Sequence, residues 1–264
     1  MGASLLVPYS FSDPNGVDPY VARIGAVSLL LLGAALLSRR LAAARPVLIA
    51  LASIAASYTV LSAMPQLLSD LLGERAPSAD AEVFWASLAQ LTVTAGLAVL
   101  ALRRLGTEAR PRLRLGRFGP GATAATLVGP LLLIGAGLAL PAALLGREAV
   151  QPTAALRDLP WLWPANLLQA LSQEVQFRGL LMGALERVSA KRWANLGQAI
   201  FFGLAHLAVN YEGPVGPFVP VTIAAGLLLG WVVQRTNSLW PAVAVHAVAD
   251  IAITVAVVPG LYGY

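Results

Sequence analysis

The residues of this chain best suited to chemistry are a few ionisable side chains within otherwise apolar stretches of its C-terminal half. Glu174 and Arg178 are four residues apart, as are His246 and Asp250, and residues at this spacing share one face of a helix. His206, the other histidine of the chain, lies in a third apolar stretch. This spacing predicts that three helices direct the five groups to one buried polar site.

Such a set of side chains has the parts needed to hydrolyse an amide bond. A glutamate and a histidine together can hold and deprotonate a water molecule. When this water attacks a peptide carbonyl, a second histidine with a polar neighbour can stabilise the oxyanion. A structural polar cluster that locks the helices together is a second interpretation.

Zinc ligation by Glu174, His206 and His246 with a bound water is a third interpretation. The sequence lacks the HExxH pair that zinc proteases carry on one helix. We therefore expect no cofactor, with zinc as the alternative. The chain has no cysteine, which excludes a disulfide, a thiolate metal ligand and a cysteine nucleophile.

The stretches that carry these residues have the length of membrane spans. The chain has 264 residues, of which 58% are hydrophobic and 12% are charged, whereas soluble domains carry about 25% charged residues. A span needs about 20 mostly apolar residues. We therefore predict an all-α polytopic membrane protein with about eight transmembrane helices, near residues 24–38, 47–68, 83–102, 119–145, 159–185, 193–209, 217–234 and 239–258.

The basic residues support this number of spans. Thirteen of the 18 arginines and lysines fall in one set of alternate loops, the longest of which is 103–118, and three fall in the opposite set. Cytoplasmic loops are enriched in these residues, so we predict that both termini lie outside the cytoplasm in a multi-pass cell membrane protein. The bias accounts for the net charge of +5 without a nucleic-acid partner. Glu186 and Arg187 are predicted to form a solvated helix end.

Three short motifs surround the ionisable residues. They read QEVQFRG at 173–179, FGLAH at 202–206 and HAVAD at 246–250. They resemble the EExxxR, FxxxH and HxxxN (or HxxxD) motifs of the CPBP family, also described as intramembrane metalloproteases. These are intramembrane glutamic endopeptidases related to CAAX-prenyl proteases and to bacteriocin-immunity proteins. The resemblance covers residues 160–255, and three motifs in order in successive spans are a specific signal.

The resemblance implies a CAAX-protease-like bundle that cuts membrane-anchored or lipidated proteins, in C-terminal processing or protein sorting. It implies that an acidic residue of the first motif and His206 activate water, and that His246 and Asp250 form the oxyanion side. Arg178 and Phe202 are then supporting residues. Within one membrane domain we predict N-terminal helices with basic loops at 1–158 and a catalytic core at 159–264.

Two positions depart from the family pattern. Gln173 stands where the first glutamate, the usual base, is expected, and Asp250 stands where asparagine is common. An amide cannot take up a proton at neutral pH, although it keeps the shape of the acid and can hold water. Asp250 must be protonated to donate a hydrogen bond, or else it orients His246.

Several interpretations of Gln173 stay open. A native glutamate was replaced to trap an inactive enzyme, Glu174 serves as the base of a divergent enzyme, or the chain is a non-proteolytic relative that binds membrane peptides in an immunity or scaffold role. A proton-coupled transporter is a further alternative, because buried Glu and His can relay protons. Spans one to four, however, offer almost no charged residue at depth.

Overall fold

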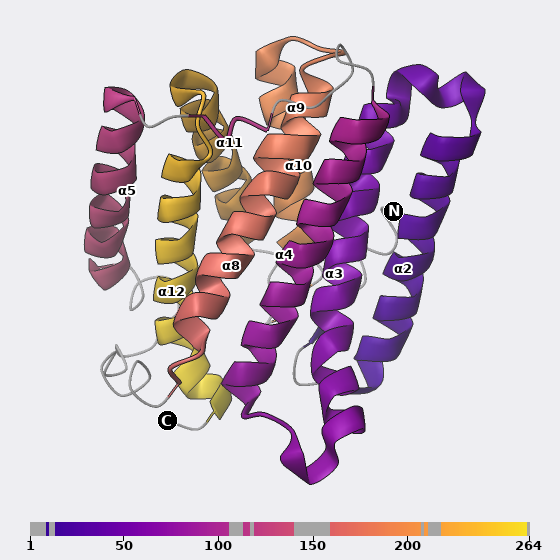
Figure 1. Ribbon diagram of the computed structural model, residues 1–264. Helices are drawn as coiled ribbons and strands as arrows, with labels where there is room; N and C mark the ends of the chain where they lie inside the picture. The colour runs from indigo at the N-terminus through magenta and orange to yellow at the C-terminus, as the bar shows by residue number, and fades with distance from the viewer. Residues whose placement is uncertain are drawn as a thin grey trace.

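The computed structural model describes residues 9–10, 14–105, 113–116, 119–139, 159–206, 209–210 and 218–262, which form a bundle of helices (Figure 1). The helices of its first half are α2 (Pro14–Leu37), α3 (Arg45–Leu72), α4 (Ala79–Arg104) and α5 (Pro120–Ala139). A continuous rod follows, made of α8 (Leu162–Glu174), the π-helical segment η3 (Val175–Leu181) and α9 (Met182–Leu185). The last three are α10 (Lys191–His206), α11 (Phe218–Thr236) and α12 (Trp240–Tyr262).

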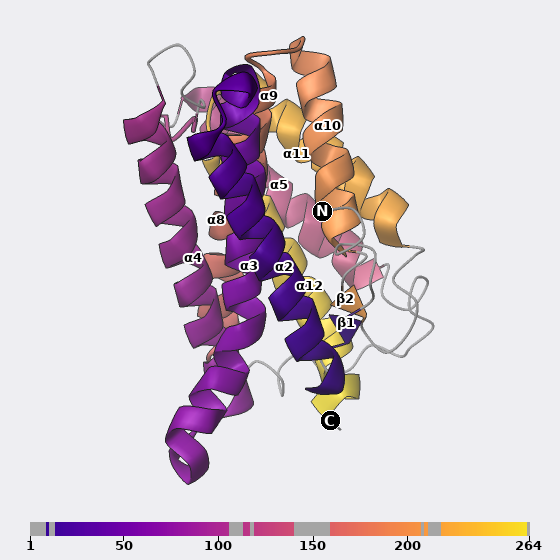
Figure 2. The ribbon, with the colours of Figure 1, turned by 90° about the vertical axis from the view of Figure 1, so that its right-hand side faces the viewer.

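Short elements join these helices. The 3-10 helices η1 (Arg39–Ala44) and η2 (Gly73–Arg75) connect α2 to α3 and α3 to α4. Two-residue strands β1 (Tyr9–Ser10) and β2 (Val209–Asn210) pair in parallel just beyond the end of α10. Figure 2 shows α2, α3 and α4 on one side of the bundle and α10 with α11 on another.

The prediction of an all-α polytopic membrane protein is confirmed. Each predicted span overlaps one helical rod, and four helical stretches of the described ranges are long and apolar enough to cross a membrane, namely Pro19–Leu37, Arg39–Arg75, Asp80–Arg103 and Val219–Thr236. The described apolar part of α12, Trp240–Ile251, is shorter. Residues 140–145, 207–208 and 217 of the predicted spans lie outside the described residues.

The first helix is longer than predicted, because it begins at Pro14 rather than at residue 24. Hydropathy marks only the apolar part of a helix, whereas backbone hydrogen bonds continue the helix past it. Arg23 lies just before the predicted span, because the span was placed by its apolar residues. In the structure Arg23 lies inside α2, and its Nε donates to the carbonyl oxygen of Pro19 at 2.9 Å. The helix thus accommodates the charge within its own first turns.

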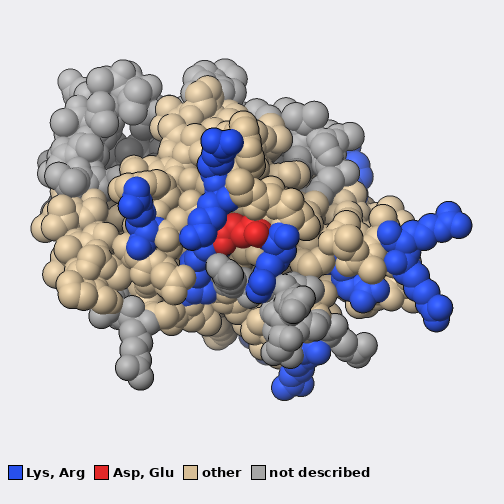
Figure 3. Space-filling view, turned by 90° about the horizontal axis from the view of Figure 1, so that it is seen from above, with Lys and Arg blue, Asp and Glu red and all other residues tan. Residues whose placement is uncertain are grey.

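The basic links gather at one end of the bundle. In Figure 1 the turn from α2 to α3, the end of α4, the turn from α9 to α10 and the start of α12 meet at this end, whereas the turn from α3 to α4 lies at the other. Viewed from above, this end carries basic side chains around a small acidic patch (Figure 3). The alternation of charge along the sequence is therefore a separation in space. That this end faces the cytoplasm stays a prediction, as does the division of the chain at residue 158.

One acidic side chain at this end is buried, which makes the prediction of a solvated Glu186 wrong. The Glu186 side chain is 4% exposed and lies 2.5 Å from Arg114 Nη2. Gln234 Nε2 donates to its other oxygen at 2.8 Å, and Leu239 N donates to the Arg114 carbonyl oxygen at 3.0 Å. The segment 113–116, which belongs to the long basic link, thus folds back onto the ends of α9, α11 and α12.

Hydroxyl and amide side chains fix how the α8 rod is turned against α4. Thr94 and Ser172 share a hydrogen bond of 2.8 Å between their hydroxyls, and Gln176 Nε2 donates to Thr94 Oγ1 at 2.9 Å. One turn earlier, Gln169 Nε2 donates to Ser87 Oγ at 3.0 Å. Such bonds hold helices together where the surroundings offer no water. Because successive residues of a helix are about 100° apart, Glu174 points away from this α4 contact.

Helices α10 and α11 approach closely through glycine. A Cβ atom added at Gly226 would lie 3.1 Å from the Cα of Ala199 and 3.3 Å from a ring carbon of Phe202. Gln198 Nε2 donates to the Gly226 carbonyl oxygen at 2.8 Å, and Asn195 Nδ2 donates to that of Leu227 at 3.0 Å. The small residue and the two amides together set the distance between the helices, and with it the position of Phe202.

We expect Gly226→Val to destabilise the protein by about 1–3 kcal/mol, because the extra methyl groups overpack a close helix contact. Thermal unfolding in detergent micelles measures the effect. Gly33→Val in α2 is the matched control, since a Cβ there meets nothing within 4 Å. Equal melting temperatures for the two variants would show that the α10–α11 contact yields freely.

Candidate active site

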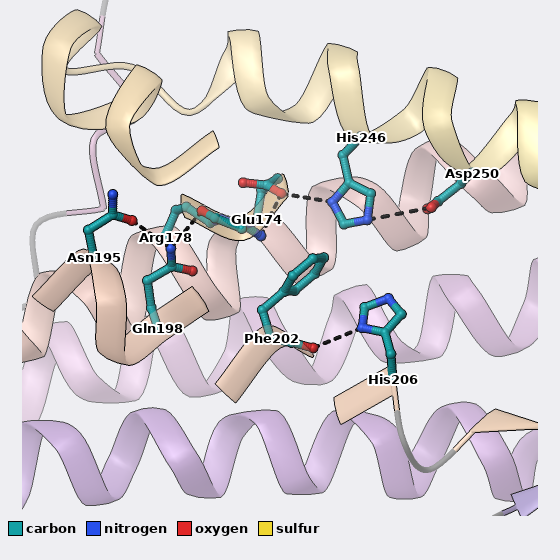
Figure 4. A network of polar contacts seen from close by, with 9 residues as sticks. Glu174, Arg178, Asn195, Gln198, Phe202, His206, His246 and Asp250 are labelled. Carbon is teal, nitrogen blue, oxygen red and sulfur yellow. Dashed lines mark hydrogen bonds and ion pairs between the residues drawn. The ribbon is translucent and has the colours of Figure 1, made fainter. Parts of the chain in front are cut away.

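The centre of the polar site is the carboxylate of Glu174, the last residue of α8. Its side chain is 0% exposed, and its Oε1 accepts a hydrogen bond of 2.9 Å from Arg178 Nη1 and one of 2.7 Å from His246 Nδ1 (Figure 4). The first bond closes one turn of the rod, and the second joins the rod to α12. The predicted pairing of Glu174 with Arg178 is confirmed.

A π-helical segment begins directly after Glu174 and contains Arg178. Short π-helical insertions are rare and occur frequently at functional sites. The segment also contains Gln176, which bonds to Thr94 of α4. Within five residues, Glu174, Gln176 and Arg178 therefore contact α12, α4 and α10, respectively. The sequence QEVQFRG at 173–179 therefore serves three helix contacts at once.

The guanidinium of Arg178 is fully buried and lies against an aromatic ring. Its central carbon is 4.3 Å from the centroid of Phe202, a distance at which the ring face attracts a cation. A buried cation needs a compensating partner, and here Glu174 and the ring supply it on two sides. Arg178 thus links the acid of α8 to the aromatic residue of α10.

Phe202 also brings the two histidines to one place. Its ring centroid is 4.7 Å from that of His206 and 5.5 Å from that of His246, and Figure 4 shows the three rings together. His206 thus approaches the cluster through the ring of Phe202. His206 is the last residue of α10, whereas the predicted span 193–209 ends at Val209, which belongs to β2.

Hydrogen bonds define which nitrogen of each histidine carries a proton. His206 Nδ1 lies 2.8 Å from the carbonyl oxygen of Phe202, and His246 Nδ1 lies 2.7 Å from the Glu174 carboxylate. A carbonyl oxygen and a carboxylate only accept hydrogen bonds, so both Nδ1 atoms donate. The Nε2 atom of each imidazole is left to act on a substrate or a water molecule.

Asp250 stands one helical turn beyond His246, as its spacing predicted. Its Oδ1 lies 3.5 Å from His246 Nε2, which is an ion-pair distance and too long for a strong hydrogen bond. Its side chain is 23% exposed, in contrast to Glu174. Asp250 is therefore the less buried of the two carboxylates.

Gln173 is 8% exposed, and its side-chain oxygen is buried. Within the described part of the chain that oxygen has no hydrogen-bond partner, and neither has the second carboxylate oxygen of Glu174. This oxygen therefore takes no part in the hydrogen-bonded cluster around Glu174.

The zinc set proposed from sequence does not fit this geometry. Over the ranges that the structure describes, no three His, Asp or Glu side chains are grouped so that they could hold a metal ion. Glu174 Oε1 already accepts two hydrogen bonds, and the Phe202 ring contacts both histidines. We derive no step through zinc.

Sequence reasoning missed the residues that orient the site. Gln169, Ser172 and Gln176 recur at helical spacing on the face of the rod opposite Glu174, and this pattern could have revealed the α4 contact. Asn195 lies on α10 two turns before Phe202 and Gln198 lies one turn before it, and Figure 4 shows both beside Arg178. Their spacing of three residues is a signal of the same kind.

The fold and the site together define this chain as a polytopic helical membrane protein with a polar Glu–Arg–His site inside its helical bundle. Residues 155–252 match the family described as Type II CAAX prenyl endopeptidase Rce1-like. The predicted resemblance to the CAAX-protease family is therefore confirmed for this segment, which contains all of the predicted site residues. No curated protein and no solved structure matches the chain.

We expect Glu174→Gln to destabilise the protein by about 3–5 kcal/mol, because it leaves the buried Arg178 without its counter-charge. The double variant Glu174→Gln with Arg178→Met should recover part of this loss, since it removes both charges. Thermal unfolding in micelles measures both. Asp70→Asn, at an exposed carboxylate of α3, is the control and should shift stability by about 0.5 kcal/mol or less. A Glu174→Gln protein as stable as this control would contradict the assigned ion pair.

Proposed function

We propose that this protein is an intramembrane endopeptidase that hydrolyses peptide bonds of membrane-anchored or lipidated proteins. The observation that carries the proposal is the Glu174–His246 hydrogen bond, which joins two motif-bearing helices around Phe202 and His206. The match of residues 155–252 to type II CAAX prenyl endopeptidases supports the reaction class. Such enzymes act on prenylated proteins held at the membrane, and the same match supports the proposed substrate class.

In this proposal His206 is the general base. Gln173 cannot take up a proton, and Glu174 is fully buried with its Oε1 committed to Arg178 and His246. His206 Nε2 is a free acceptor because Nδ1 donates to the Phe202 carbonyl oxygen. Glu174 is then a positioning residue rather than the base.

His246 supplies the oxyanion side. It lies between the carboxylates of Glu174 and Asp250, which stabilise its doubly protonated form, so that Nε2–H can donate to a developing oxyanion. Water attacks the carbonyl carbon while His206 takes its proton. The tetrahedral intermediate then collapses, the C–N bond breaks, and His206 returns the proton to the leaving amine.

Gln173 in this scheme holds the attacking water and does not deprotonate it. The native chain is then active with a histidine alone as the base. This differs from a trapped form, in which only a restored glutamate would give cleavage, and from a non-proteolytic relative, in which neither form cleaves. The three cases give different outcomes in one assay.

We expect His206→Ala to lower the cleavage rate of a lipidated reporter peptide by about 10²–10⁴-fold, which is the usual contribution of a general base. The assay uses purified protein in proteoliposomes, and Asp70→Asn is the control for handling. If the native chain and Gln173→Glu both fail to cleave any lipidated or membrane-anchored reporter, the chain is a non-proteolytic binding protein. If only Gln173→Glu cleaves, the native chain is a trapped form.

We expect chelators such as EDTA and phenanthroline to leave the cleavage rate unchanged within about twofold, because the proposed base and oxyanion donors are side chains. The rate is measured before and after dialysis against each chelator, with a zinc protease treated in parallel as a positive control. Loss of cleavage that added zinc restores would overturn the proposed roles of both histidines.

A further inference from the structure

The buried cluster contains two carboxylates and one guanidinium whose charges do not balance without a histidine. Glu174 lies 2.9 Å from Arg178 and 2.7 Å from His246, and Asp250 lies 3.5 Å from the other nitrogen of His246. If His246 carries two protons, the four groups sum to zero. If it carries one, the cluster holds a net negative charge inside the bundle, which is costly where water is scarce.

Gln173 directly precedes Glu174 in α8, and its side-chain oxygen is buried. Helices α8 and α12 run in opposite directions and lie against each other (Figure 1). Asp250 is one turn past His246 on α12, so it lies level with residues shortly before Glu174 on α8. A charge at position 173 would be next to Glu174 in the chain, which bonds to His246, and charges act over longer distances where water is scarce.

We propose that Asp250 is a positioning residue that keeps His246 doubly protonated, and that the cluster accepts one carboxylate at either position 173 or position 250, but not at both. In this chain the carboxylate is at position 250, and the residue at position 173 is accordingly a neutral amide. This inference rests on the proposed function for its kinetic part, whereas its charge balance is a property of the folded protein alone.

Among the residues that the structure describes, no further charged group faces His246 to replace Asp250. The charged or titratable groups that face His246 are Glu174 and Arg178 of the α8 rod, His206 of α10, and Asp250 of its own helix. The described side chains of α5 include no charged residue. The charged residue of α11 is Arg235, which lies at the basic end of the bundle and stacks on Trp231. Removing the Asp250 charge therefore leaves Arg178 and His246 to share Glu174.

A double-mutant cycle tests the exchange with Asp250→Asn, Gln173→Glu and the combination of the two. We expect each single variant to cleave the lipidated reporter about tenfold more slowly than the native chain and to melt at a lower temperature. The double variant restores the charge and should recover both quantities, so that full recovery corresponds to a coupling of about 100-fold in rate between the two positions. A residue needed only for packing would not be rescued by a change on another helix.

The exposed pair Gln66 and Asp70 provides a matched control, because Gln66 Nε2 donates to Asp70 Oδ1 at 2.7 Å on the surface of α3. Gln66→Glu, Asp70→Asn and their combination make the same chemical changes and should show no coupling in rate. Additive effects at 173 and 250, or a Gln173→Glu variant faster than the native chain, would overturn the inference. If no variant cleaves, the proposed function fails, and the melting temperatures still decide whether the two positions are coupled.

Discussion

The structure depends on the neutralisation of a guanidinium that is buried in a helical bundle. Arg178 has no access to water, so its charge is balanced by Glu174 and by the face of Phe202. Because Glu174 also accepts a hydrogen bond from His246, the same carboxylate that neutralises Arg178 fixes the orientation of a histidine on another helix. Stability and site geometry therefore rest on one acidic side chain, which explains why it is poorly suited to be the base.

The rest of the bundle holds this carboxylate in place. The hydroxyls and amides between α4 and the α8 rod fix the rotation of the rod, and the glycine contact between α10 and α11 fixes the position of Phe202. Helix α4 thus acts on the site through packing, although it supplies none of the charged groups of the site. This arrangement gives α4 a physical role that its composition did not reveal.

The helices and the three motif-bearing segments could be predicted because hydropathy and i, i+4 spacing are local properties. The same reasoning failed for Glu186, which looked like a solvated helix end and is instead buried against Arg114 from a link 72 residues away. It also named Phe202 only as a supporting residue and did not show that its ring contacts both histidines. Contacts between distant segments decided each of these cases.

The sequence by itself determined the membrane class, the helical rods, the separation of basic loops and the set of side chains available for chemistry, because apolar length and charge are written residue by residue. Only the tertiary structure decided how those side chains share their bonds. The choice of His246 rather than His206 as the partner of Glu174 depends on how α8, α10 and α12 are turned and spaced, and long-range packing sets that rotation.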